Sequence, residues 1–174
     1  MREPSPWDAY YRRAGLGSPR PTLLRALEGF TGEGRLGPGL RAVDLGCGVG
    51  RDALELLRRG FLTVAIDSEP TALAGLRRNA ETLGVADRLE TILDRMEAAS
   101  WPECDLVNAS FALPLCPPDA FGGLWARILA SLRPEGRFAG QLYGPRDGWA
   151  GRPGLTILAR AEVERLLRGL AVEL

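Results

Sequence analysis

Glycines and acidic residues gather at the ends of two short apolar runs, where they could bind a nucleoside-containing ligand. Gly46, Gly48 and Gly50 follow the first run, and Asp67 closes the second, 23 residues after Asp44. Glycines between a strand and a helix let the backbone turn sharply and let a ligand lie close against it. The start of the helix behind them offers free amide groups, and an acid at the end of the next strand can accept hydrogen bonds from ribose hydroxyls. The spacing therefore predicts a nucleoside-binding site.

The residue types that are missing exclude several reaction classes. The chain has no histidine, and all 22 of its basic residues are arginine, so it has no lysine either. A Ser-His-Asp triad, a histidine-ligated metal, a P-loop lysine and a Schiff-base lysine are therefore excluded. The three cysteines are too few for a four-cysteine zinc site, and we expect no metal. A general base would have to be Asp, Glu, Tyr, Cys or water.

The details of the glycine run indicate which nucleoside is bound. A dinucleotide fingerprint has the spacing G-x-G-x-x-G. Here Gly50 comes one place too early, and Arg51 fills the position where that fingerprint has a small residue. Asp44, directly before the glycines, would also repel a pyrophosphate. A ligand with an amino group and a sulfonium but no phosphate suits this acid better, and S-adenosylmethionine is such a ligand.

In these residues the chain resembles the class I S-adenosylmethionine-dependent methyltransferases, over about residues 41–143. The resemblance rests on the glycine run with Asp44, on Asp67, on Asp94 after a third apolar run, and on residues 132–136. It implies that S-adenosylmethionine is the cofactor and that a methyl group passes to a small-molecule acceptor.

The same resemblance implies a role for each residue of the cofactor site. Gly46 and Gly48 line the amino acid portion of the cofactor, and Asp44 lies near its amino group. Asp67 holds the ribose, and Asp94 with Met96 brackets the adenine. The stretch 108–111 runs beneath the methionine portion and faces the acceptor. The expected cofactor-binding residues are Asp44, Gly46, Cys47, Gly48, Gly50, Asp67, Ser68, Asp94, Met96 and Asn108.

A narrower resemblance indicates the acceptor. Stretches 7–11, 113–118 and 140–149 are similar to the small methyltransferases grouped with tellurite-resistance proteins. A thiolate or a metalloid oxyanion is a soft nucleophile that needs no strong base, which agrees with the missing histidine and lysine. Tyr11, Tyr143 and Arg146 are the candidate catalytic residues.

Alternating strand and helix patterns must position these side chains. Apolar runs predict strands over 40–45, 61–66, 88–93, 105–110, 137–143 and the start of a sixth over 170–174, and helical spacing predicts helices over 22–30, 52–59, 70–83, 119–132 and 160–169. This order predicts an α/β fold with a Rossmann-like, mostly parallel sheet and helices on both faces. We expect one domain over 1–174, with an N-terminal arm and helix over 1–39 and the core over 40–174. Trp7, Tyr10 and Tyr11 on the arm are a candidate lid, because aromatic faces attract a sulfonium cation.

Charge, hydropathy and length set further expectations. The 22 basic and 22 acidic residues balance, so no broad basic field for nucleic acid is built in. No apolar run is long enough to span a membrane, and the first residues have no apolar signal segment, so a cytoplasmic protein is expected. The class I fold normally ends in an antiparallel strand hairpin, and this chain stops at Leu174. We therefore expect a truncated hairpin and a homodimer through the exposed sheet edge.

Two other functions remain open at this point. The chain could be a non-catalytic module that binds S-adenosylmethionine without turning it over. It could also be an NAD(P)-dependent reductase, although the early Gly50 and Arg51 argue against a dinucleotide site.

Overall fold

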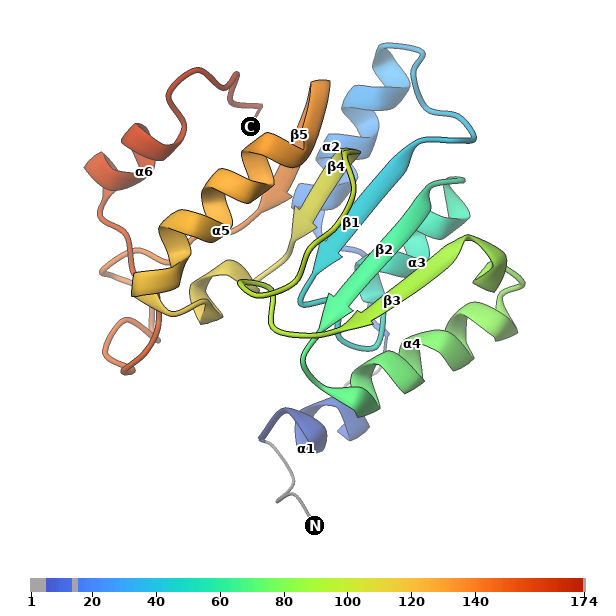
Figure 1. The fold of residues 1–174 in the computed structure, drawn as a ribbon, viewed down its shortest axis with the longest axis horizontal. Helices are drawn as coiled ribbons and strands as arrows, with labels where there is room; N and C mark the ends of the chain where they lie inside the picture. Colours follow the sequence, from blue (N-terminus) through green and yellow to red (C-terminus); the bar gives the residue numbers. More distant parts are fainter. Residues whose placement is uncertain (1–5, 14–15, 174) are drawn as a thin grey trace.

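A parallel sheet lies between two helical layers in the computed structural model, which describes residues 6–13 and 16–173 (Figure 1). Within these residues, five strands pair in the order β3-β2-β1-β4-β5, and every pairing is parallel. The strands are β1 (Arg41–Leu45), β2 (Leu62–Asp67), β3 (Leu89–Leu93), β4 (Cys104–Ala109) and β5 (Leu132–Gly140). The helices are α1 (Pro6–Arg13), α2 (Pro21–Gly32), α3 (Arg51–Arg58), α4 (Pro70–Thr82), α5 (Pro118–Ser131) and α6 (Arg160–Leu166).

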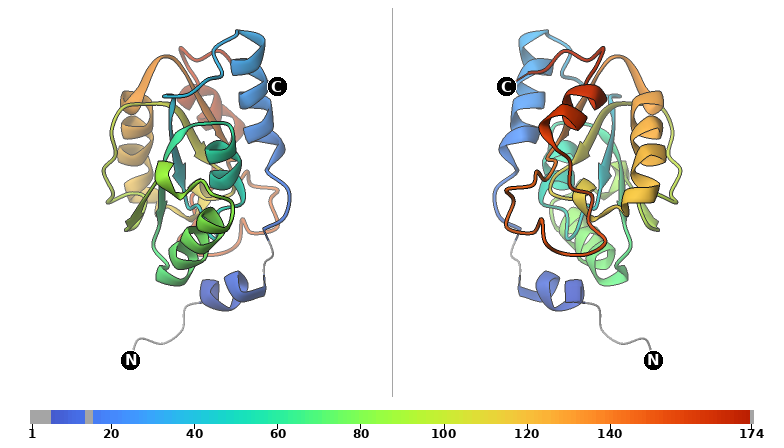
Figure 2. Two further views of the ribbon diagram at one scale, coloured as in Figure 1. Left: turned by 90° about the vertical axis from the view of Figure 1, so that its right-hand side faces the viewer. Right: turned by 90° about the vertical axis from the view of Figure 1, so that its left-hand side faces the viewer.

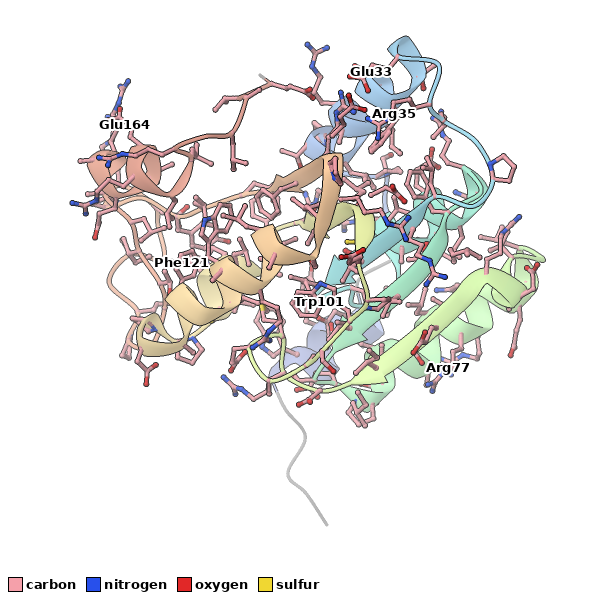
Figure 3. The ribbon with its side chains drawn as sticks, turned by 45° about the horizontal axis from the view of Figure 1, so that its top comes forward. Glu33, Arg35, Arg77, Trp101, Phe121 and Glu164 are labelled. Atoms are coloured by element: carbon pink, nitrogen blue, oxygen red, sulfur yellow. The ribbon has the colours of Figure 1, made fainter. Side chains whose placement is uncertain are left out.

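Each face of the sheet is covered by apolar side chains from a different helical layer. Helices α2, α3 and α4 cover one face, and α5 covers the other (Figure 1). Strands β1 and β4 are buried along almost their whole length, as expected for a parallel sheet covered on both sides. Figure 3 labels Phe121 on α5 and Trp101 in the segment that leads into β4. The Trp101 indole donates a hydrogen bond to Ser131 Oγ at 2.9 Å, which fixes that segment to the end of α5.

The strand order places the site. From β1 the chain continues outward to β2 and β3, then returns to place β4 and β5 on the other side. Ligands of such sheets bind in the crevice beyond the carboxyl ends of the strands where this reversal occurs. Helix α1 lies beyond this same edge of the sheet (Figure 2). The arrangement confirms the predicted Rossmann-like α/β fold.

The predicted fifth strand over 137–143 was wrong at both ends. Strand β5 begins at Leu132, directly after α5, and ends at Gly140. Its pairing with β4 shifts register between Cys104, opposite Leu132, and Leu106, opposite Arg137. The stretch 133–136, which directly precedes the predicted strand, is thus an irregularity inside β5, and Glu135 there has a φ of 62°. The local residue types indicate a turn, but they do not reveal that the residues on both sides of it pair with the same strand, β4.

The predicted start of a sixth strand over 170–174 was also wrong for residues 170–173, and Leu174 lies outside the described residues. Ion pairs fix this segment instead, because Arg137 contacts Glu173 at 3.0 Å and Glu33 at 2.6 Å. Figure 3 shows Glu33 near the end of α2. In the part of the chain that the structure describes, β3 and β5 are the outer strands of the sheet. The expected homodimer through an exposed sheet edge stays a prediction.

No helix among the described residues is long and apolar enough to cross a membrane.

Gly50 offers a test of the close packing behind the glycine loop. Its φ is 98°, and a Cβ there would lie 2.3 Å from Leu76 Cδ1 on α4. Gly50→Ala is expected to lower the free energy of unfolding by about 1–3 kcal/mol, because both the backbone and the packing must shift. Gly32→Ala is the matched control, since nothing lies within 4 Å of that position. Urea unfolding checks this; equal midpoints for Gly50→Ala and wild type would contradict it.

Candidate functional site

A cleft of about 470 Å³ opens at the carboxyl ends of the strands, bordered by α1, the glycine loop and the segments after β2, β3, β4 and β5. Ten of the thirteen predicted site residues line it: Tyr11, Asp44, Gly46, Cys47, Gly48, Asp67, Ser68, Asp94, Met96 and Tyr143. The other three, Gly50, Asn108 and Arg146, are not part of its lining. The topology therefore brings together residues that the sequence spreads over more than 130 positions.

Asp67 is the centre of the hydrogen bonding in this cleft. Its Oδ2 accepts a bond from the Gly48 amide at 2.8 Å and a longer one from the Tyr11 hydroxyl at 3.4 Å. Its Oδ1 accepts a bond from the Glu69 amide at 2.9 Å. Burial raises the pKa of Asp67 above its ordinary value, although these bonds act in the opposite direction. The carboxylate is thus fixed at the end of β2 and joined directly to the glycine loop.

The glycine loop has no room for larger residues. Gly46 has a φ of 67°, and a Cβ on it would lie 2.6 Å from Ala112 Cβ. Gly48 has a φ of 54°, and a Cβ on it would lie 2.8 Å from Tyr11 Cε1. Both positions thus require glycine for conformation and for space. Helix α1 closes tightly on this loop through Tyr11.

Asp44 is a buried carboxylate that is only partly satisfied. It is 2% exposed, and its Oδ1 accepts a hydrogen bond from Asn108 Nδ2 at 2.7 Å. Its Oδ2 has no hydrogen-bond partner among the described residues. Burial, and then the nearby charge of Asp52, raise the pKa of Asp44 well above its ordinary value. An unpaired acceptor in this position suits a cationic group of a ligand.

Asn108 lies beneath the cleft and connects two of its buried acids, Asp44 and Asp52. Its side-chain amide also donates to Asp52 Oδ2 at 3.2 Å, and its oxygen accepts from the Ser110 hydroxyl at 3.2 Å. Asn108 has no exposed surface. It therefore positions Asp44 from below.

Among the cleft residues that sequence reasoning missed are Asp52 and Arg20. Asp52 is buried in the first turn of α3, and its Oδ1 accepts a bond from the Arg20 amide at 2.9 Å. The Arg20 guanidinium lies over the Phe111 ring, 4.6 Å from its centroid. An acid two places after the glycine run was a visible signal for Asp52. Nothing in the sequence brings the start of α2 to the end of β4.

Burial raises the pKa of both candidate catalytic tyrosines. Burial, followed by the charge of Asp67, raises the pKa of Tyr11 strongly, and burial raises that of Tyr143. Burial likewise raises the pKa of the Cys47 thiol. Arg146 is exposed and lies outside the cleft lining. No cluster of three or more acidic or cysteine side chains suited to a metal ion occurs among residues 6–13 and 16–173.

Comparison with known proteins agrees with this geometry. A family model described as "Methyltransferase domain" matches residues 42–136, more than half of the chain. A ribosomal protein L11 methyltransferase from Xylella fastidiosa is 45% identical over 71 residues, which cover 40% of this chain but only 23% of that protein.

Two solved structures illustrate the likeness in fold. A Burkholderia thailandensis 1,6-didemethyltoxoflavin-N1-methyltransferase, solved with S-adenosylhomocysteine, is 25% identical with a TM-score of 0.64, over 88% of this chain and 69% of that one. TehB from Haemophilus influenzae is 17% identical with a TM-score of 0.67, over 81% of this chain and 48% of that one. The family match covers the glycine loop, Asp67 and the strands that position them, and these residues fit S-adenosylmethionine, so the chain belongs to the methyltransferase domain family.

Proposed function

We propose that this protein transfers a methyl group from S-adenosylmethionine to a small-molecule acceptor. The observation that carries the proposal is the bond between the Gly48 amide and Asp67 Oδ2, 2.8 Å long, at the edge of the 470 Å³ cleft. It joins a glycine loop too tight for any side chain to an acid at the end of the neighbouring strand. When bound, S-adenosylmethionine supplies an activated methyl group on a sulfonium.

Different residues of the cleft bind different parts of the cofactor. Asp67 accepts the ribose hydroxyls, and Asp94 with Met96 brackets the adenine. Gly46 and Gly48 let the amino acid portion lie against the loop. Asp44, with its unpaired Oδ2, attracts the ammonium group.

The Arg20 guanidinium binds the carboxylate of the amino acid portion of the cofactor. Three arginines line the cleft. Arg51 donates to the Leu16 carbonyl at 2.9 Å, and Arg95 pairs with Glu97. Among the described residues, the Arg20 guanidinium has only the Phe111 ring as a partner. It is thus the cation best placed to meet an incoming carboxylate.

The acceptor is a soft nucleophile, a thiol or a metalloid oxyanion. The reaction is an in-line displacement, in which a new bond to the methyl carbon forms as the sulfur–carbon bond breaks. Tyr11 and Tyr143 retain their protons, so neither serves as a base near neutral pH. The protein then acts mainly by holding the two reactants in line, and a nucleophile that is already anionic needs no base.

Transfer of labelled methyl groups tests this function. We expect the purified protein with radiolabelled S-adenosylmethionine to methylate a thiol, selenite or tellurite above the rate without protein. Transfer to none of them would contradict the soft nucleophile. Binding of S-adenosylhomocysteine without transfer to any acceptor would favour the non-catalytic binding module instead.

A further inference from the structure

Three aromatic side chains form one wall of the cleft, on the side away from Asp67. Phe111 follows β4, and Tyr143 and Trp149 lie in the segment after β5; all three line the cleft. The Phe111 and Tyr143 ring centroids are 6.4 Å apart, and those of Tyr143 and Trp149 are 6.3 Å apart at 76°. The rings therefore form a continuous aromatic surface, unlike the acidic side of the cleft.

The fold fixes Phe111 in an unfavourable conformation. Its φ is 58°, in the left-handed region that bulky residues avoid, and 41% of it is exposed to solvent. The Phe111 amide donates to Gln141 Oε1 at 2.8 Å, and Gln141 Nε2 donates to Thr22 Oγ1 at 2.8 Å. Side chains from α2 and from the residue after β5 thus support a strained backbone. A large apolar ring that is both strained and exposed inside a cleft points to a ligand contact.

Two arginines stack on rings of this wall, and one of them, Arg20, itself lines the cleft. The Arg20 guanidinium lies 4.6 Å from the Phe111 centroid, and the Arg152 guanidinium lies 4.0 Å from that of Trp149. Arginine stacked on an aromatic face orients it. All three rings line the cleft, where a flat conjugated ligand gains more from them than an aliphatic one of the same size.

We propose that the methyl acceptor carries a flat aromatic ring, which binds against Phe111, Tyr143 and Trp149. This inference rests on the proposed methyl transfer and narrows its acceptor. An aromatic thiol matches both the wall and the soft nucleophile, whereas a bare metalloid oxyanion would leave the wall unused.

Calorimetric titration of two matched probes tests the ring without requiring methyl transfer. Protein saturated with S-adenosylhomocysteine is titrated with 2-naphthol and with decahydro-2-naphthol, which share a hydroxyl and a carbon skeleton but differ in planarity. We expect 2-naphthol to bind about tenfold more tightly or better, from two or more aromatic contacts. Equal affinities would overturn the proposal.

Phe111→Gly separates the contact from folding, because glycine adopts the left-handed backbone without strain. This variant should keep the melting temperature of the wild type and lose about tenfold in 2-naphthol affinity. Leu83→Ala is the control, since Leu83 is 39% exposed and lies outside the cleft. Unchanged 2-naphthol affinity in folded Phe111→Gly would overturn the proposal.

The same titrations show separately whether the methyltransferase function or the aromatic acceptor is wrong. If S-adenosylhomocysteine binds but 2-naphthol does not, the aromatic acceptor is wrong and the methyltransferase function stands. If S-adenosylhomocysteine does not bind, the proposed function fails. In that case 2-naphthol is titrated into the protein without S-adenosylhomocysteine, to show whether the aromatic wall binds a ring by itself. Absence of binding would overturn the aromatic-acceptor proposal as well.

Discussion

Asp67→Ala is expected to weaken the binding of S-adenosylhomocysteine by about 10- to 100-fold, because charge-assisted hydrogen bonds contribute roughly 1.5–3 kcal/mol. The ribose hydroxyls would lose their acceptor. The Gly48 amide, which donates to Asp67 Oδ2 at 2.8 Å, would lose its partner as well. The loss therefore combines a missing contact with a loosened glycine loop.

Isothermal titration calorimetry measures the effect, and two further variants show its origin. Asp67→Asn retains one oxygen that can accept the Gly48 amide, so it should bind more tightly than Asp67→Ala and less tightly than the wild type. Asp87→Ala removes the same charge at an exposed position outside the cleft. If Asp67→Ala bound no more weakly than Asp87→Ala, the ribose role would be refuted. A thermal melt monitored by circular dichroism shows whether each variant is folded.

Much of the fold could be predicted because local signals and long-range contacts agreed. Pro70 fits the first turn of a helix, and Gly84, with a φ of 67°, ends the same helix. The buried strands β1 and β4 appear in the sequence as short, mostly apolar runs, with Asp44 in the first and Asp105 and Asn108 in the second. At 133–136 the signals disagreed: Pro134, Glu135 and Gly136 indicate a turn, but the chain on both sides of them pairs with β4.

The clustering of the glycine loop and the acids in one cleft could be predicted for a similar reason. Asp44, the glycines and Asp67 each end or follow a strand, so the parallel topology alone brings them together. The stretch 108–111, which includes Phe111, was expected to face the acceptor. Arg20 and Asp52 could not be found in this way. Their roles depend on the Arg20 amide reaching Asp52 and on the Arg20 guanidinium covering Phe111. The first contact depends on where the start of α2 lies relative to α3, and the second on where it lies relative to the end of β4.

The expected lid consists of Trp7, Tyr10 and Tyr11. All three residues lie on α1 and line the cleft. Their rings contact one another, with centroids 5.4–6.3 Å apart. Closure of this helix over a bound cofactor stays a prediction.

Asp44 connects stability to function through its protonation. Burial and the charge of Asp52 raise its pKa well above the ordinary 3.8. Between that ordinary value and its raised pKa, the folded state holds a proton that the unfolded state has released. Stability is therefore greater at the acidic end of this range and falls as the pH rises through the raised pKa. A bound ammonium group would favour the ionised form, so cofactor binding should release a proton.

Asp44→Asn should thus raise stability and lower affinity at pH 7. Removing a buried, partly unpaired charge should increase the free energy of unfolding by about 1–3 kcal/mol, and the gain over the wild type should shrink at pH 5. The affinity for S-adenosylhomocysteine should fall by about tenfold or more, because the ammonium loses its counter-charge. Urea unfolding at both pH values and calorimetry measure the two effects.

Asp105→Asn is the matched control for this experiment. Asp105 is a buried acid that is paired with a cation, since its Oδ2 accepts from the Arg41 amide at 2.8 Å and contacts Arg133 at 3.2 Å. Its replacement should lower stability at pH 7, the reverse of Asp44→Asn, and should leave the affinity for S-adenosylhomocysteine unchanged, whereas Asp44→Asn lowers it. If Asp44→Asn instead destabilised the protein equally at pH 5 and pH 7, its carboxylate would be serving the fold, and the unpaired Oδ2 would not be reserved for the cofactor.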